Sequence, residues 1–136
     1  MKIRNIAIII LYNSQKKILL QHRSEDAERF PGLWGCFGGG IEDGETPLEA
    51  ARRETKEELG YLLSKPNLIL TEEFKGKHHD GTRHFFVEEY NPAQKLVLGE
   101  GQNMMWLSFA EARKLKLSGI AREILDHIED NEIWKK

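Results

Sequence analysis

Three consecutive glycines followed by a strongly capped helix constrain this chain more than any other feature. Behind Gly38–Gly40, Thr46 and Glu49 have the spacing of a capping box, in which each residue bonds the backbone of the other. Gly60 is a typical helix stop signal. Consecutive glycines carry no side chains, so their backbone can approach a ligand closely. The pattern predicts a helix over residues 47–59 that starts next to an open backbone segment.

The predicted helix carries three carboxylates on one face. Glu54, Glu57 and Glu58 stand at i, i+3 and i+4, which brings their side chains together. Clustered carboxylates repel one another unless a cation lies between them, and a hard ion such as Mg²⁺ or Mn²⁺ prefers oxygen ligands. Arg53 lies one turn before Glu57 and could orient its carboxylate. The ordinary alternative is a solvated acidic helix face, and the preceding glycines favour the metal site.

The stretch from Gly39 to Tyr61 resembles the signature of the Nudix hydrolase family, Gly-x5-Glu-x7-Arg-Glu-U-x-Glu-Glu-x-Gly-U, where U is a bulky aliphatic residue. Thr55 and Tyr61 replace two of the aliphatic residues, at positions that supply no ligand. The resemblance implies an α/β fold, the Nudix α/β/α sandwich with a mixed sheet, as a single domain over residues 1–136. The fixed residues present are Gly39, Glu45, Arg53, Glu54, Glu57, Glu58 and Gly60.

The resemblance also implies roles for individual residues. Glu100 lies in a Gly-Glu-Gly-Gln loop that in several relatives reaches the metal cluster, and a solvated turn is its ordinary alternative. Either Glu54 or Glu100 would be the base that takes a proton from water, and the sequence does not choose between them. The implied catalytic residues are Glu54, Arg53 and Glu100. The implied metal ligands are the carbonyl of Gly38 with Glu54, Glu57, Glu58 and Glu100.

Three residues are candidate substrate contacts. Arg23 ends a predicted strand, and its guanidinium matches phosphate geometry. Phe37 precedes the glycines, where relatives often carry proline, and Gly39 would allow a close approach of the substrate. Phe37, Phe86 and Trp106 could stack on a base, although aromatic residues in strands more often belong to the core.

The coarse pattern predicts strands alternating with helices. Residues 76–82 are expected to form a loop in which His78 and His79 face solvent, with phosphate contact as the alternative. Ser108 and Glu111 form a second capping box ahead of a short helix. The other elements predicted are strands near 4–12, 17–22, 34–37, 68–75, 84–90 and 104–107, and a last helix over about 119–128.

Composition limits the classes of partner. The chain has 136 residues, which suits one domain, and its net charge of −2 gives no general attraction to nucleic acid or to an anionic membrane. No signal peptide is visible, and the apolar run over residues 6–11 is too short to span a bilayer. The single cysteine, Cys36, suggests a reducing compartment, so a cytoplasmic protein is expected. A homodimer is left open.

The resemblance implies a Mg²⁺-dependent pyrophosphohydrolase that acts on a nucleoside diphosphate linked to another group. Residues Glu72–Gly81 carry neither the proline that marks ADP-ribose enzymes nor the tyrosine that marks dinucleoside polyphosphate enzymes, which leaves a nucleoside triphosphate. One alternative is a nucleotide-sensing Nudix domain without turnover, although such domains usually lose box glutamates and this chain shows no DNA-binding domain. Another is an enzyme like isopentenyl diphosphate isomerase, for which Cys36 would be the reactive cysteine.

Overall fold

The computed structural model describes residues 2–28, 30–98, 103–131 and 133, and within them eight strands form one mixed sheet. The strands are β1 (Lys2–Ile3), β2 (Ile6–Tyr12), β3 (Ile18–His22), β4 (Trp34–Gly35), β5 (Phe37–Gly40), β6 (Asn67–Lys75), β7 (His79–Glu89) and β8 (Asn103–Leu107). The helices are α1 (Pro47–Leu59), α2 (Phe109–Arg113) and α3 (Gly119–Asp130).

Strand β2 organises the sheet. It pairs in parallel with β7 and antiparallel with β3 and β5, so that Ile6 lies between Arg83 on one side and Gly40 on the other. β6 adds antiparallel to β7, and β8 and β4 pair with β3. The continuous apolar run of β2 is explained by this position, because a strand covered on both faces has no polar side to present.

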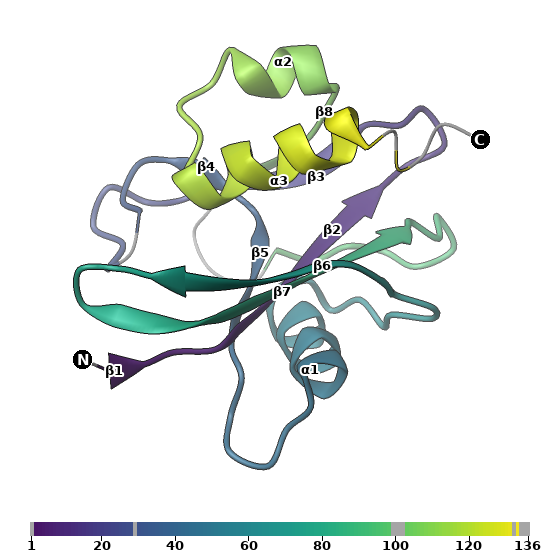
Figure 1. Ribbon diagram of the computed structural model, residues 1–136. Coiled ribbons are helices and arrows are strands. Elements are labelled where there is room, and N and C mark those ends of the chain that lie inside the picture. The colour runs from purple at the N-terminus through teal and green to yellow at the C-terminus, as the bar shows by residue number, and fades with distance from the viewer. Residues whose placement is uncertain (1, 29, 99–102, 132, 134–136) are drawn as a thin grey trace.

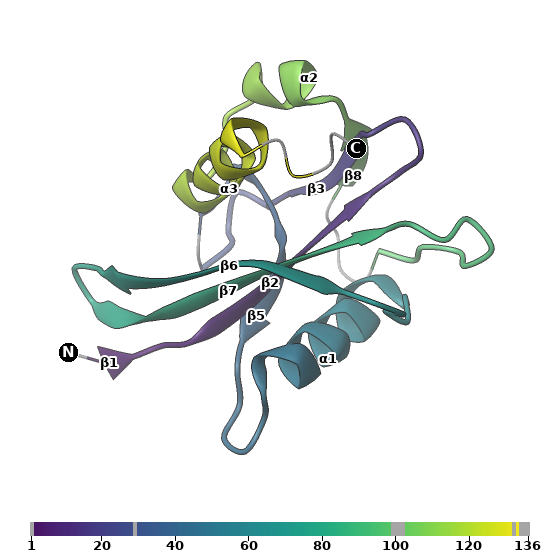
Figure 2. The same ribbon diagram turned by 45° about the vertical axis from the view of Figure 1, so that its right-hand side comes forward.

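Helices cover both faces of the sheet. Figures 1 and 2 show α1 on one side and α2 with α3 on the other. Alternate side chains of β2 enter the two layers: Ile8 packs in the cluster that includes residues of α3, and Ile9 packs in the cluster that includes residues of α1. The predicted α/β/α sandwich with a mixed sheet is therefore confirmed.

Helix α1 has the predicted bounds and caps. The Thr46 hydroxyl accepts the Glu49 N–H at 3.1 Å, the Glu49 carboxylate accepts the Thr46 N–H at 2.8 Å, and Gly60 ends the helix with φ of 62°. The helix buries Ala50, Ala51, Thr55 and Leu59. The two departures from the Nudix signature are fully buried: the hydroxyl of Thr55 bonds the Ala51 carbonyl, and that of Tyr61 accepts the Asn91 N–H.

One predicted loop is largely a strand. β7 begins at His79, although residues 76–82 were expected to form a loop. The reason is a long-range pairing: β1 runs parallel to the start of β7, with Lys2 opposite His79 and Ile3 opposite Asp80. The strand predicted over 34–37 is two strands, β4 and β5, and β5 continues through Gly40; the other predicted strands and the last helix are confirmed to within a few residues.

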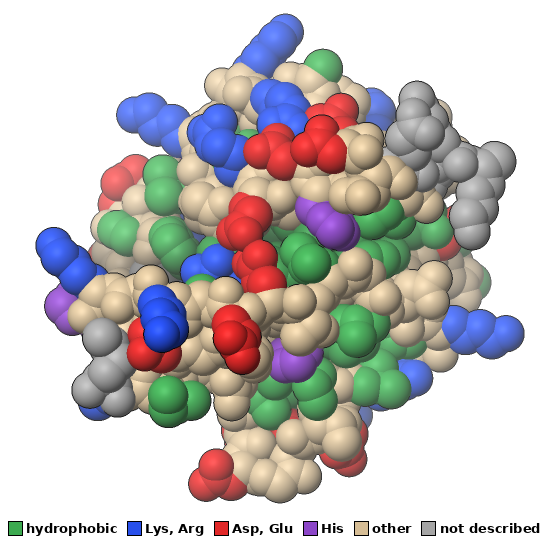
Figure 3. All heavy atoms as spheres, viewed as in Figure 1, with side chains coloured by type: hydrophobic (Ala, Val, Ile, Leu, Met, Phe, Trp, Pro, Cys, Tyr) green, Lys and Arg blue, Asp and Glu red, His purple; other side chains and the backbone are tan. Residues whose placement is uncertain are grey.

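The surface carries charges of both signs. On the face shown in Figure 3, acidic, basic and apolar side chains are interspersed. Arg113 of α2, for example, pairs with Asp126 and Glu129 of α3. None of the helices in the described part of the chain has the length and apolarity to cross a bilayer.

Candidate active site

Helix α1 meets the outer edge of the glycine strand β5. One edge of β5 pairs with β2, and on the other edge the Gly38 N–H donates to Glu58 Oε1 at 3.0 Å. Two residues along the same edge, the Gly40 carbonyl accepts from Arg53 Nη2 at 2.9 Å. Glu58 and Arg53 of α1 therefore bond the backbone groups that a neighbouring strand would otherwise pair with.

Close packing surrounds two of the glycines, and at Gly38 it requires a glycine. Gly38 has φ of 142°, a conformation that side chains rarely adopt, and a Cβ there would lie 2.2 Å from the Ala7 carbonyl oxygen. A Cβ on Gly39 would lie 2.6 Å from Oε1 of Glu54. The carboxylate of Glu54 thus lies directly against the backbone of β5, and the close approach of a ligand at these glycines stays a prediction.

The buried carboxyl at this edge belongs to Glu58. The pKa of Glu58 is raised to about 7, mainly by burial; the bond from Gly38 lowers the pKa in part, and the charge of Glu54 contributes to the rise. A carboxyl with a raised pKa beside a second carboxylate is an environment that a cation would stabilise, since a positive charge between them favours both ionised forms. The donor atoms are all oxygen, which fits a hard divalent ion.

Arg53 ties the loop before α1 to the helix. It donates to Glu45 at 2.7 Å and to Glu54 at 2.9 Å, and its contact with Glu57 is longer, at 3.4 Å. Its hydrogen bonds lower the pKa of the Glu45 carboxyl. The sequence predicted the Glu57 contact alone, whereas the main partner is Glu45, the second fixed residue of the signature.

The predicted metal ligands are only partly assembled. Glu54 and Glu58 flank the glycines, while the side chain of Glu57 is 59% exposed and lies on Arg53. Within the residues that the structure describes, no three acidic, histidine or cysteine side chains are close enough together to hold a metal ion. Glu100 lies outside the described residues.

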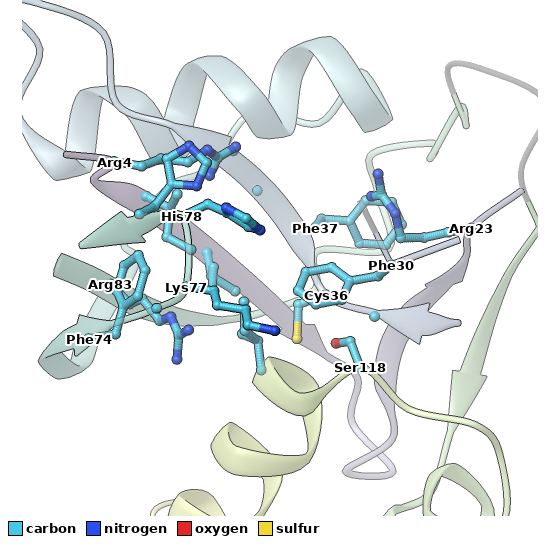
Figure 4. A pocket seen from close by; sticks show the side chains of 18 residues that line it. Arg4, Arg23, Phe30, Cys36, Phe37, Phe74, Lys77, His78, Arg83 and Ser118 are labelled. Carbon is cyan, nitrogen blue, oxygen red and sulfur yellow. The ribbon is translucent and has the colours of Figure 1, made fainter. Parts of the chain in front are cut away.

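A cavity of about 520 Å³ adjoins the glycine strand. Its lining includes Ile6, Ile8 and Cys36 together with Gly38 and Gly39. Figure 4 shows side chains of the β6–β7 hairpin on one side, with Arg23 and Phe30 on the other. Among the residues that the structure describes, the charged side chains of the lining are all basic, namely Arg4, Arg23, Lys77 and Arg83, and two histidines, His78 and His79, join them.

The three predicted substrate contacts all line this cavity, in different ways. Arg23 and Gly39 lie at its wall. The ring of Phe37 is 2% exposed and packs in the cluster beneath α1, so it offers little surface to a base. Phe86 belongs to the same buried cluster, and Trp106 packs against Tyr90 at 5.2 Å. Phe37, Phe86 and Trp106 therefore pack in or against the hydrophobic core, which is the usual place of aromatic residues in strands.

Two other aromatic residues face the cavity. Phe30 is 40% exposed and has φ of 49°, an uncommon conformation for a bulky residue. Phe74 of β6 carries the guanidinium of Arg83 over its ring, 4.3 Å from the centroid. Both residues stand beside features that are visible in the sequence, the Phe30-Pro31-Gly32 turn and the basic segment around Lys77. Neither feature by itself indicates a cavity.

Cys36 lies half-buried among the cavity residues. Burial raises the pKa of its thiol to about 12. Because the thiolate is the nucleophilic form, this environment does not suit the reactive cysteine that an isomerase would need.

Comparison with known proteins gives a family and a fold. The NUDIX domain profile matches residues 1–128. A nucleoside triphosphatase NudI from Enterobacter sp. (strain 638) is 47% identical over 63 residues, which are 46% of this chain and 44% of that protein. The chain thus spans less than half the length of that curated relative.

Solved structures extend the likeness over the whole chain. A MutT protein from Methanosarcina mazei Go1 superposes with a TM-score of 0.83 at 20% identity, covering 99% of this chain and 97% of that one. The NUDIX domain of Shewanella oneidensis NrtR, complexed with ADP ribose, superposes with a TM-score of 0.79 at 16% identity, covering 96% and 88%. At these identities the likeness concerns the fold.

Proposed function

The chain belongs to the Nudix hydrolase family, and from this premise we propose that it is a Mg²⁺-dependent pyrophosphohydrolase of nucleoside triphosphates. The reaction would be attack of water on phosphorus, releasing a nucleoside monophosphate and pyrophosphate. Mn²⁺ is a second candidate metal, because it accepts the same oxygen ligands.

The observation that supports this proposal most is that an acidic cluster and a basic cavity both adjoin strand β5. Carboxylates of α1 lie against Gly38 and Gly39, and the same glycines line a cavity whose described charged side chains are basic. A substrate with an anionic anhydride and a large organic group needs both environments. The phosphates would lie near the carboxylates and their metal, and the nucleoside would enter the cavity.

We assign Glu54, Glu57, Glu58, Glu100 and the Gly38 carbonyl as metal ligands. When bound, Mg²⁺ would neutralise phosphate oxygens and lower the pKa of a bound water. Glu57 would join by rotating its exposed side chain away from Arg53, with which it makes only the long contact. Either Glu54 or Glu100 would accept the proton of the attacking water. Arg53 would act as a positioning residue, because it holds Glu54 and the Gly40 carbonyl in one arrangement.

The substrate class rests on the cavity and on the relatives. Residues Glu72–Gly81 lack the markers of ADP-ribose and dinucleoside polyphosphate enzymes. The matched relative is called a nucleoside triphosphatase. Phe30 and Phe74 replace Phe37 as candidates for stacking on the base, since all three residues line the cavity but Phe37 is only 2% exposed.

A substrate panel tests the proposal. The purified protein is incubated with nucleoside triphosphates, ADP-ribose, sugar nucleotides and dinucleoside polyphosphates, with Mg²⁺ or with EDTA, and phosphate and pyrophosphate are measured. We expect the highest kcat/KM for triphosphates, with pyrophosphate as product and no turnover in EDTA. A preference for one of the other classes would overturn the substrate assignment. Nucleotide binding without turnover of any compound would indicate the sensing alternative.

A further inference from the structure

Arg83 is a cation of the cavity that is held on several sides. Its Nη1 donates to Glu72 at 3.3 Å and to Glu123 of α3 at 3.2 Å, and its guanidinium lies over the ring of Phe74. The side chain is only 19% exposed. Two carboxylates and a ring thus fix the plane of the guanidinium before any ligand arrives, which lowers the entropy cost of using it in recognition.

The fixed guanidinium leaves two of its nitrogens, Nε and Nη2, without a hydrogen bond to any residue that the structure describes. Both ion pairs of Arg83 are made by Nη1, and Nε is buried without a hydrogen-bond partner. Nη2 makes no hydrogen bond to any residue that the structure describes. Arg83 lines the cavity, and an acceptor atom of a ligand within reach of Nη2 would meet a donor that is already held in place.

The position of Arg83 relative to the glycines suits a base. Arg83 stands opposite Ile6, and Ile6 stands opposite Gly40, so β7, β2 and β5 form one row across the sheet. Two inter-strand spacings separate the backbone of Arg83 from the glycine strand by about 10 Å. That is the kind of distance a nucleoside spans, so an anhydride at the glycines would bring its base to Arg83.

The described side chains that line the cavity provide more hydrogen-bond donors than acceptors. Arginine and lysine side chains donate only, and the described lining includes no carboxylate and no side-chain amide. Among the few side-chain acceptors, Ser118 Oγ already accepts the Ala121 N–H. A base with an exocyclic amino group would leave that group poorly paired, whereas a keto oxygen would meet a charged donor.

We propose that Arg83 selects nucleotides whose base carries a keto group and no exocyclic amino group, as in hypoxanthine, uracil or thymine, by donating from Nη2 to the keto oxygen. The inference rests on the proposed function, because it places the anhydride at the glycine strand. Arginine donation to the O6 and N7 atoms of guanine is a well-known pairing in other complexes, so the chemistry is available.

Two nucleotides that differ at the keto group provide the test. Inosine triphosphate has the O6 oxygen, and purine riboside triphosphate lacks it. For wild type we expect kcat/KM to favour inosine triphosphate by about tenfold to a hundredfold, the usual effect of one hydrogen bond to a charged group. In Arg83→Met this ratio should fall close to one. Equal kcat/KM values for the two nucleotides in wild type would overturn the proposal.

The control is Arg113→Met. Arg113 is also held by two carboxylates, Asp126 and Glu129, but it does not line the cavity, so its loss should leave the ratio unchanged. Arg83→Lys keeps the charge and loses the planar fork, and we expect it to retain only part of the preference. The wild-type ratio remains decisive if Arg83→Met fails to fold.

Binding of the monophosphates separates this inference from the proposed function. Calorimetry with inosine monophosphate and purine riboside monophosphate needs no turnover. Tighter binding of the inosine compound that is lost in Arg83→Met supports the keto selection even if no triphosphate is hydrolysed. Hydrolysis of both triphosphates at one rate, with equal dissociation constants, refutes the selection and leaves the hydrolase standing. Failure of both monophosphates to bind also refutes it.

Discussion

Replacing Glu58 by glutamine should change how stability depends on pH. In the folded protein without metal the pKa of Glu58 is about 7, against an ordinary value of 4.5, and burial is the main cause. Between these two pH values the folded state holds a proton that the unfolded state has released. Protonation of Glu58 therefore stabilises the folded state fully below pH 4.5, and this contribution is lost as the pH rises through 7. Glutamine carries no such proton.

The magnitude follows from the two pKa values. A pKa difference of one is worth about 1.4 kcal/mol, so the rise at Glu58 amounts to at most about 3.4 kcal/mol by pH 8. Rearrangement of Glu54 and entry of water reduce this limit, and we expect about 2 kcal/mol. Relative to wild type, Glu58→Gln should therefore be more stable at pH 8 than at pH 5 by that amount. The Gly38 N–H keeps an acceptor in the glutamine variant.

Urea unfolding in EDTA at pH 5, 6, 7 and 8 measures the effect, because linear extrapolation gives the free energy of unfolding for each protein. Glu57→Gln is the matched control: it removes one charge from the same helix, but from a side chain that is 59% exposed. Parallel pH profiles for wild type and Glu58→Gln would refute the raised pKa. Adding Mg²⁺ at pH 8 should stabilise wild type more than the glutamine variant, since a ligand stabilises the state that binds it.

Four further predictions concern activity and packing. Glu57→Gln should lower kcat by on the order of a hundredfold with folding intact, measured as pyrophosphate release under saturating Mg²⁺; unchanged turnover would remove Glu57 from the ligand set. Glu100→Gln should slow turnover and leave the melting temperature nearly unchanged, and wild-type activity would make Glu54 the sole candidate base. Cys36 should react slowly with iodoacetamide at pH 8, because burial raises its pKa to about 12, and rapid labelling in the folded protein would contradict this. Gly38→Ala should destabilise by roughly 3 kcal/mol or more, since its Cβ would lie 2.2 Å from a carbonyl oxygen, whereas a Cβ at Gly40 meets nothing within 4 Å and Gly40→Ala should cost little.

Local signals in the sequence predicted the local parts of the structure. The bounds of α1, its capping box and the left-handed Gly60 depend on residues within one helix and its ends. The same is true of the capping box of Ser108 and Glu111. These features could be predicted because each needs only neighbours three or four positions away.

Features that depend on distant residues could not be predicted in this way. Arg53 was assigned to Glu57 by helical spacing, but the loop before the helix folds back and presents Glu45 at a shorter distance. The early start of β7 depends on β1, more than seventy positions earlier in the chain. Leu48 and Leu62 stand at helical spacing from the buried Ala51 and Leu59, yet they are 39% and 60% exposed.

The glycine strand explains why the site has two chemical characters. A side chain at Gly39 would occupy the position of the Glu54 carboxylate, and one at Gly38 would collide with β2. Bare backbone at these two positions lets acidic side chains approach from α1 while the basic cavity reaches the same residues. Substitutions on α1 should therefore alter the metal dependence of hydrolysis, and substitutions on the β6–β7 hairpin should alter the preference for one base over another. If Arg83→Met altered the Mg²⁺ requirement, or Glu57→Gln altered the preference between the two purine nucleotides, this division of the site would be wrong.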